Sequence, residues 1–180
     1  MNPYCEYCLT HPEDTFNKPY HDTLYGFPID DDDALFERLI LEINQAGLSW
    51  ITILKKAEGF RRAYDGFHIE TVAGYGESDR ARLLADAGII RNRLKVNAAI
   101  ENAKRIRALQ QEFGSFKAWL DAQPLKTKDE WTKLFKKTFV FTGGEIVSEF
   151  LMSTGYLPGA HSEDCPVFGE VAKLKPAWMR

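Results

Sequence analysis

The chain has few cysteines and no long apolar run. It contains three Cys among 180 residues, and no apolar stretch approaches the roughly 20 residues that a membrane-spanning helix needs. The N-terminal residues lack the basic and apolar stretches of a secretory signal peptide, so we expect a cytoplasmic protein without a membrane partner. Cytosolic thiols stay reduced, and metal binding is therefore favoured over a framework of disulfides.

Internal repeats, low-complexity tracts and long Gly/Ser linkers are also absent. A chain of this length with 44% hydrophobic residues can bury one core of ordinary size. We therefore expect a single domain over residues 1–180, with a helical body at about 30–155 and termini at about 1–28 and 156–180. We also expect a monomer.

Strand patterns are scarce, whereas the helical spacing of apolar residues dominates from residue 33 onward. The acidic run at residues 30–33 favours a helix start, and Gly47 breaks that helix. Ser78 is a candidate cap for a helix that extends to Ala87, and further helices are expected at about residues 115–122, 127–137 and 144–154. The last 25 residues carry several prolines and are expected to be mostly loop. The sequence thus predicts an all-α fold.

A tight turn at Gly88, followed by a basic helix, is typical of a helix-hairpin-helix. The net charge of −3 gives no sign of nucleic-acid binding, but a sum over the whole chain can hide a local basic face. Turn N–H groups and a helix N-terminus attract phosphate, and Arg91, Arg93 and Lys95 would add positive charge beside them. An ordinary helix pair with an exposed basic edge explains the same pattern.

The two ends of the chain hold the residues with metal-ligand chemistry. Cys8 and His21 lie near the start, and His161 and Cys165 lie near the end. Two thiolates and two imidazoles form a tetrahedral Zn²⁺ set, and four protein ligands leave no open position, which indicates a structural ion. Cys5 forms a Cys-x-x-Cys pair with Cys8 that could bind metal without His21, and His11 is a further alternative.

Glu42 is unusual because it lies in an otherwise apolar helical stretch at residues 39–43. A buried carboxylate needs a partner or a function. Trp50, eight positions later, is spaced as a core residue would be, so the pattern alone does not place it in a pocket.

Three runs resemble the 3-methyladenine DNA glycosylase I family. They are Tyr20-His21-Asp22, QAGLSWITILKK at residues 45–56 and DAGIIRNR at residues 86–93. The likeness continues in register from Cys8 to about Ala103. It implies a helix-hairpin-helix glycosylase fold in which one structural Zn²⁺, on Cys8, His21, His161 and Cys165, ties the two termini together, with Cys5 as an extra thiol.

The resemblance also implies a base-excision repair enzyme. It would flip 3-methyladenine out of alkylated double-stranded DNA, hydrolyse its N-glycosidic bond and leave an abasic site without cutting the strand. The implied catalytic residues are Tyr20, Glu42 and Trp50. The implied substrate-binding residues are Tyr25, Phe16, Gly47 and Leu48, and the implied DNA-binding residues are Gly88, Ile89, Arg91, Arg93 and Lys95.

Three positions depart from the family pattern: Tyr25 stands where Trp is usual, Leu24 where an acidic residue is usual, and Asn17 where an aromatic residue is common. These departures keep open a non-catalytic, zinc-stapled module that binds DNA or senses damage. A zinc hydrolase is a further alternative, which would need an open coordination position on the metal.

Overall fold

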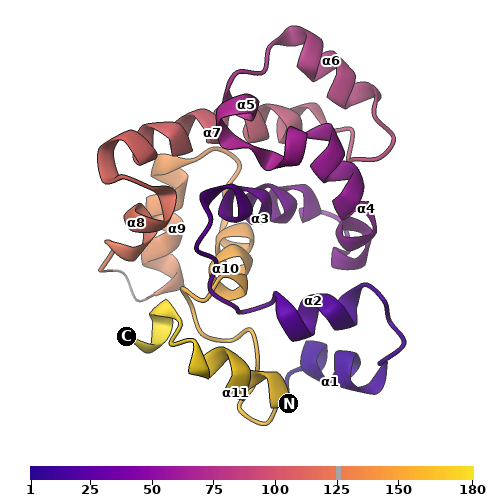
Figure 1. Cartoon of the computed structure of the whole chain (residues 1–180), viewed down its shortest axis with the longest axis vertical. Coiled ribbons are helices and arrows are strands. Elements are labelled where there is room, and N and C mark those ends of the chain that lie inside the picture. The colour runs from indigo at the N-terminus through magenta and orange to yellow at the C-terminus, as the bar shows by residue number, and fades with distance from the viewer. Residues whose placement is uncertain (125–126) are drawn as a thin grey trace.

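The computed structural model describes residues 1–124 and 127–180, and over those residues it contains helices and no strands (Figure 1). The predicted all-α fold is confirmed. The α-helices are α1 (Pro3–Thr10), α2 (Asn17–Thr23), α3 (Asp32–Gln45), α4 (Trp50–Ala63), α5 (Ile69–Ala73), α6 (Glu77–Ala85), α7 (Arg93–Phe113), α8 (Phe116–Asp121), α9 (Lys128–Thr138), α10 (Gly144–Ser153) and α11 (Pro166–Lys173). Two short 3₁₀ helices, η1 (Asp65–Phe67) and η2 (Ala177–Met179), complete the order.

Helix α3 lies at the centre of the body, where it packs against α4, α7, α8 and α10 (Figure 1). The acidic run starts this helix as the sequence predicts, because the Asp31 carboxylate accepts a hydrogen bond from the Ala34 amide at 2.9 Å. The Asp32 carboxylate accepts hydrogen bonds from the Phe116 and Lys117 amides at 2.8 and 3.0 Å. These bonds connect the start of α8 to the start of α3. The acidic run therefore caps α3 and holds α8 against it.

The turn between α6 and α7 is packed tightly on α4. A Cβ atom added at Gly59 would come within 2.3 Å of the Gly88 carbonyl oxygen, so only glycine fits there. Asn92 caps α7, accepting a hydrogen bond from the Lys95 amide at 3.1 Å. The predicted pair of helices joined by a tight turn is present, and its position is set by contact with α4.

One local prediction was wrong. The N-cap of α6 is Gly76, and Ser78 lies inside the first turn of that helix. The C-terminal segment is mostly loop, as predicted, and it also contains the short helix α11, which Pro166 can begin because its missing N–H group costs nothing in the first turn. The helices expected at residues 115–122, 127–137 and 144–154 are confirmed to within one or two residues as α8, α9 and α10.

The two chain ends meet at one side of the molecule, where α1, α2 and α11 lie together (Figure 1). A small second cluster, formed by Cys5, Cys165, Val167 and Val171, is buried there, apart from the main core. The Asn2 amide donates to the Ser162 hydroxyl at 3.0 Å, and the N-terminal amine pairs with Asp164 at 2.8 Å. Among the described residues, no helix is both long enough and apolar enough to span a membrane.

Candidate active site and metal centre

A cavity of about 740 Å³ opens between α3, α4, α10 and the first two helices. Its walls combine aromatic rings, small residues and carboxyl groups. The lining residues are Tyr4, Tyr20, Tyr25, Glu42, Gln45, Ala46, Gly47, Trp50, Gly143, Gly144, Glu145, Ile146 and Glu149. A cavity of this size and composition is typical of a small-molecule or nucleobase site.

Aromatic side chains form one continuous wall of the cavity. The rings of Tyr20 and Trp50 are 5.2 Å apart between centroids, and the rings of Tyr20 and Tyr25 are 5.6 Å apart. Tyr4 meets Tyr25 edge-on at 5.5 Å. The Trp50 indole Nε1 is buried and, over the described part of the chain, has no hydrogen-bond partner. This donor is therefore available to an acceptor on a bound ring.

Glu42 places a carboxyl group against that wall. The residue lies in the C-terminal half of α3 and is 3% exposed. Burial raises the pKa of Glu42 to about 8, and the nearby Arg38 guanidinium acts in the opposite direction. Arg38 is held by the Ser153 carbonyl oxygen at 3.1 Å and lies over the Tyr20 ring, 5.2 Å from its centroid.

A second carboxyl group, Glu149, reaches the same cavity from α10. The Tyr25 hydroxyl donates to its Oε2 at 3.4 Å, and burial raises its pKa. Glu145, one turn earlier, lines the rim and pairs with Lys128 of α9 at 2.9 Å. The cavity thus receives carboxyl groups from both α3 and α10.

The structure brings five of the predicted site residues together at this cavity: Tyr20, Tyr25, Glu42, Gly47 and Trp50. Phe16 is not among the lining residues. Its ring is 41% exposed and lies beneath the Lys55 amine, so its predicted contact with substrate stays a prediction. Leu48 is also outside the lining, on the exposed loop that follows Gly47.

Sequence reasoning missed Tyr4 and Glu149. Tyr4 stands on α1, and its hydroxyl donates to the Asn17 Oδ1 at 3.2 Å. Asn17 stands where an aromatic residue is common, and its side-chain amide holds the aromatic ring of Tyr4 from α1. No pattern in the sequence pointed to Tyr4, because its place depends on how α1 docks. Glu149 was detectable only as one of two acidic residues on a helix that is otherwise rich in apolar residues.

The turn before α7 presents two exposed arginines, Arg91 and Arg93. Lys95 is 5% exposed, and its amine donates to the carbonyl oxygens of Asn44 and Ala46 at 2.8 and 2.7 Å. The predicted DNA contact by Lys95 was therefore wrong, because this amine caps the end of α3 inside the protein.

The backbone of the same turn is largely occupied. The Gly88 amide donates to Asp86 Oδ1 at 2.7 Å, and the Ile89 amide donates to the Asp86 carbonyl oxygen at 3.4 Å. The Ile89 side chain is buried. These two residues shape the turn, and the exposed arginines supply its positive charge.

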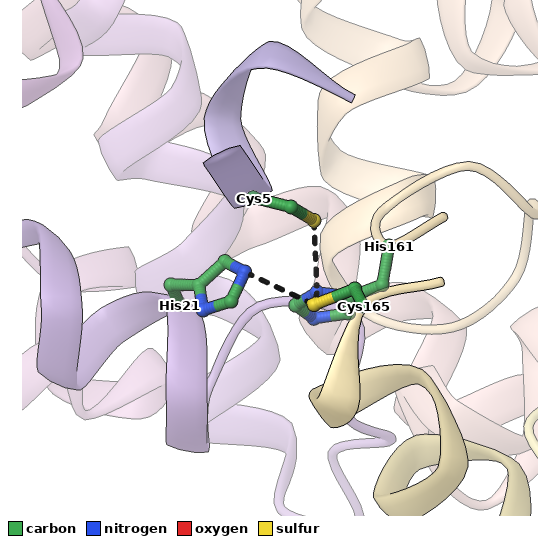
Figure 2. Close-up of side chains that lie close together, drawn as sticks. All are labelled: Cys5, His21, His161 and Cys165. Carbon is green, nitrogen blue, oxygen red and sulfur yellow. Dashed lines mark hydrogen bonds between the residues drawn. The ribbon is translucent and has the colours of Figure 1, made fainter. Parts of the chain in front are cut away.

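Two cysteines and two histidines converge where the chain ends meet, as Figure 2 shows. The donor atoms of Cys5, His21, His161 and Cys165 all lie within 4.8 Å of one another, and all four residues are buried. Cys5 Sγ is 3.6 Å from His161 Nδ1, and Cys165 Sγ is 3.7 Å from His21 Nε2.

The second ring nitrogen of each histidine already has a partner. His21 Nδ1 donates to Asp22 Oδ1 at 2.7 Å, and His161 Nε2 donates to the Tyr25 carbonyl oxygen at 2.7 Å. These bonds leave His21 Nε2 and His161 Nδ1 with lone pairs facing the two sulfurs. This arrangement of an oriented imidazole with an outer acceptor is typical of metal-ligating histidines.

The structure corrects one member of the predicted ligand set. Cys8 lies one turn further along α1, and its thiol donates to the Asn17 carbonyl oxygen at 3.8 Å. The first turn of α1 docks on the C-terminal segment, since the Asn2 amide nitrogens donate to the Ala160 carbonyl and the Ser162 hydroxyl. This docking brings Cys5 to the cluster in place of Cys8.

The buried carboxyl of Glu42 predicts a pH-dependent stability. Its pKa is raised from 4.5 to about 8 on folding, so the folded state keeps a proton that the unfolded chain loses between these values. Stability from this group is complete below pH 4.5 and is lost as the pH rises through about 8. The free energy of unfolding of Glu42→Gln, relative to that of the wild type, should therefore increase by about 2 kcal/mol or more from roughly pH 6 to roughly pH 9.

Urea unfolding at the two pH values measures this change. Glu101→Gln, an exposed helical substitution paired with Arg105, is the matched control and should show no such gain. If the stability difference between Glu42→Gln and the wild type is the same at both pH values, the Glu42 carboxyl is either solvated or fully paired with a positive charge.

Comparison with known proteins places this site in a family context. A profile of the methyladenine glycosylase family matches residues 10–132. DNA-3-methyladenine glycosylase from Haemophilus influenzae is 35% identical over 166 residues, which cover 82% of this chain and 89% of that protein. DNA-3-methyladenine glycosylase 1 from Escherichia coli K12 is 36% identical over 169 residues, covering 83% and 90%.

A solved structure agrees over nearly the whole length. The 3-methyladenine DNA glycosylase I from Staphylococcus aureus, studied for its recognition of 3-methyladenine, superposes with a TM-score of 0.81 at 33% identity. The match covers 91% of this chain and 97% of that one. Because the profile covers more than half of the sequence and the curated relatives exceed 30% identity over most of it, the chain belongs to the methyladenine glycosylase family.

Proposed function

We propose that this protein is a monofunctional DNA glycosylase that hydrolyses the N-glycosidic bond of 3-methyladenine in alkylated DNA and leaves an abasic site. The observation that carries the proposal is the meeting of Glu42 with the Tyr20 and Trp50 rings in one cavity. The relatives named for this activity support it.

The cavity chemistry suits a flipped, alkylated adenine. An adenine methylated at N3 within DNA carries a positive charge on its ring, and the faces of Tyr20 and Trp50 favour a cationic ring. The positive charge of the bound ring would favour the ionised form of Glu42, which would accept a hydrogen bond from the exocyclic amine, and the unpaired Trp50 Nε1 would donate to a ring nitrogen. A carboxylate faces the carbonyl oxygen of guanine unfavourably, so alkylguanine should be rejected.

The positive charge of the ring also weakens the bond to be broken. The C1′–N9 bond breaks with its electron pair moving to the ring, which becomes neutral, and water adds to the sugar carbon and loses a proton. No enzyme nucleophile is needed for so good a leaving group. Lys95 of α7, whose amine donates to the Asn44 and Ala46 carbonyl oxygens, is held by the backbone, which supports hydrolysis without strand cutting.

Glu42→Gln should lose 3-methyladenine excision by about 10- to 100-fold, because an amide replaces a charge-assisted hydrogen bond worth about 1.5–3 kcal/mol. Release of modified bases from methylated duplex DNA, resolved by chromatography, measures the loss. Affinity for undamaged duplex should stay within about two-fold, because phosphate contacts lie elsewhere. Wild-type protein that binds this DNA but releases no base would instead be a damage-sensing module.

We propose that the α6–α7 turn acts as the helix-hairpin-helix that anchors the DNA backbone. Arg91 and Arg93 are exposed beside the start of α7, where the helix dipole adds positive potential. Leu48 is 38% exposed and follows Gly47, whose φ of 79° turns the loop sharply at the cavity edge. This apolar side chain would fill the gap in the duplex that the flipped nucleotide leaves.

Arg91→Ala and Arg93→Ala should each weaken binding to all duplex sequences alike, because a phosphate contact carries no base information. Each should also reduce the slope of log affinity against log salt concentration by about one. Fluorescence anisotropy over a salt series measures both effects. Lys173→Ala, which removes an exposed α11 amine paired with Glu170, is the control. Unchanged slopes for both arginine variants would remove this turn from the interface.

We propose that Cys5, His21, His161 and Cys165 hold one structural Zn²⁺. Two thiols and two oriented imidazoles match the ion's preferred donor set, and burial of all four gives it a closed site. A bound ion would stabilise the thiolates and fix the two chain ends to each other. Four protein ligands leave no position for a reacting water, so the ion would have no part in the hydrolysis.

Purified protein should contain one equivalent of Zn²⁺ by elemental analysis. Cys5→Ser and Cys165→Ser should lose the ion and unfold at a lower temperature, since metal binding to a folded site adds directly to folding free energy. Cys8→Ser removes a buried thiol from the same helix and should retain the ion. Loss of zinc in Cys8→Ser with retention in Cys5→Ser would show that α1 docks in a different register.

A further inference from the structure

Glu149 has no place in the recognition chemistry described above, yet it lines the same cavity as Glu42. The two carboxyl groups come from different helices, α10 and α3, which pack against each other. The hydrogen bond that Glu149 accepts from Tyr25 is long, at 3.4 Å, and therefore weak. Its oxygens are thus oriented by this bond without being strongly committed to it.

The charges around the cavity do not cancel when the carboxyl groups are ionised. Among the described residues, the lining carries three carboxyl groups, Glu42, Glu145 and Glu149. Lys128 neutralises Glu145 at 2.9 Å, and Arg38 acts on Glu42. Tyr20 and Tyr25 are neutral, and the Lys95 amine lies behind the wall on backbone carbonyls. One negative charge is left over, and it belongs to Glu149.

A base methylated at N3 within DNA carries one positive charge, and it loses that charge when the glycosidic bond breaks. An excess of one negative charge therefore favours the nucleotide over ordinary purines and over the released product. Hydrogen bonds and stacking alone distinguish these species less well, because the shape of the ring is nearly the same in all of them. Charge is the property that separates substrate from product.

We propose that Glu149, oriented by Tyr25 and sharing the cavity with Glu42, is a specificity-determining residue that makes the pocket select cationic alkylpurines over neutral purines. This inference rests on the proposed glycosylase function, and it adds a residue to the recognition of the same substrate. Glu42 and Trp50 form hydrogen bonds with the edge of the ring, and Glu149 supplies the negative charge that complements the positive charge of the ring.

Two small probes of similar shape test the assignment. The 3,9-dimethyladeninium ion carries a positive charge at about pH 8.5, because both ring nitrogens are alkylated, whereas 3-methyladenine is neutral at this pH. Titration calorimetry at about pH 8.5 should show Glu149→Gln binding the cation about 10-fold more weakly than the wild type, with the neutral base changed by less than about three-fold. Glu170→Gln, an exposed α11 carboxylate paired with Lys173, should change neither affinity.

The conservative variant Glu149→Asp separates a charge effect from a structural one. It keeps the negative charge and should retain most of the preference for the cation. This variant still tests the proposal if Glu149→Gln folds poorly. Equal losses for both probes in Glu149→Gln, or an unchanged cation affinity, would overturn the proposal, as would an Asp variant that behaves like the Gln variant.

The base-release assay on wild-type protein keeps the two proposals apart. If the wild type releases no 3-methyladenine from methylated DNA, the proposed function fails, and the ratio of the two probe affinities still decides whether Glu149 selects for charge. If the wild type releases the base but Glu149→Gln keeps the cation preference, only the assignment of Glu149 fails.

Discussion

The junction between the two chain ends positions one whole wall of the cavity. Tyr20 immediately precedes His21 on α2, and His161 donates a hydrogen bond to the carbonyl oxygen of Tyr25 at 2.7 Å. Tyr4 is adjacent to Cys5 on α1. Each of these tyrosines is therefore held by a residue of the Cys/His cluster or by its neighbour in sequence. On the remaining walls, Trp50 and Ile146 pack against the main core.

A single buried amine holds the backbone at the Ala46–Gly47 edge of the cavity. Lys95 donates to the carbonyl oxygens of Asn44 and Ala46, which would otherwise be unpaired at the end of α3. This bond fixes the path of the chain into the Gly47 turn, and it connects the start of α7 to the cavity edge. The helix that begins at the exposed Arg93 thus also sets the geometry of the loop beside the pocket.

Much of the fold could be predicted because it follows from local pattern. The acidic cap of α3, the Gly47 break and the Gly88 turn are local signals, and the family-like runs placed Tyr20, Glu42 and Trp50 in register. The exchange of Cys8 for Cys5 could not be predicted, because it depends on how α1 docks on residues 160–162. The DNA contact predicted for Lys95 was wrong for a similar reason, since a basic residue within a basic run is expected to be exposed unless its tertiary partners are known. Tyr4 and Glu149 join the site only through packing between distant segments.

The carboxyl groups of the cavity connect stability with recognition. Burying Glu42 and Glu149 raises the pKa of each, which means that ionising them in the folded protein is unfavourable. Packing that served stability alone would replace such groups with apolar side chains of similar volume. A cation that enters the cavity reverses this balance, because it stabilises the ionised form that burial disfavours. The unfavourable burial therefore makes the pocket respond to the one property, positive charge, that an alkylated adenine gains and an undamaged base lacks.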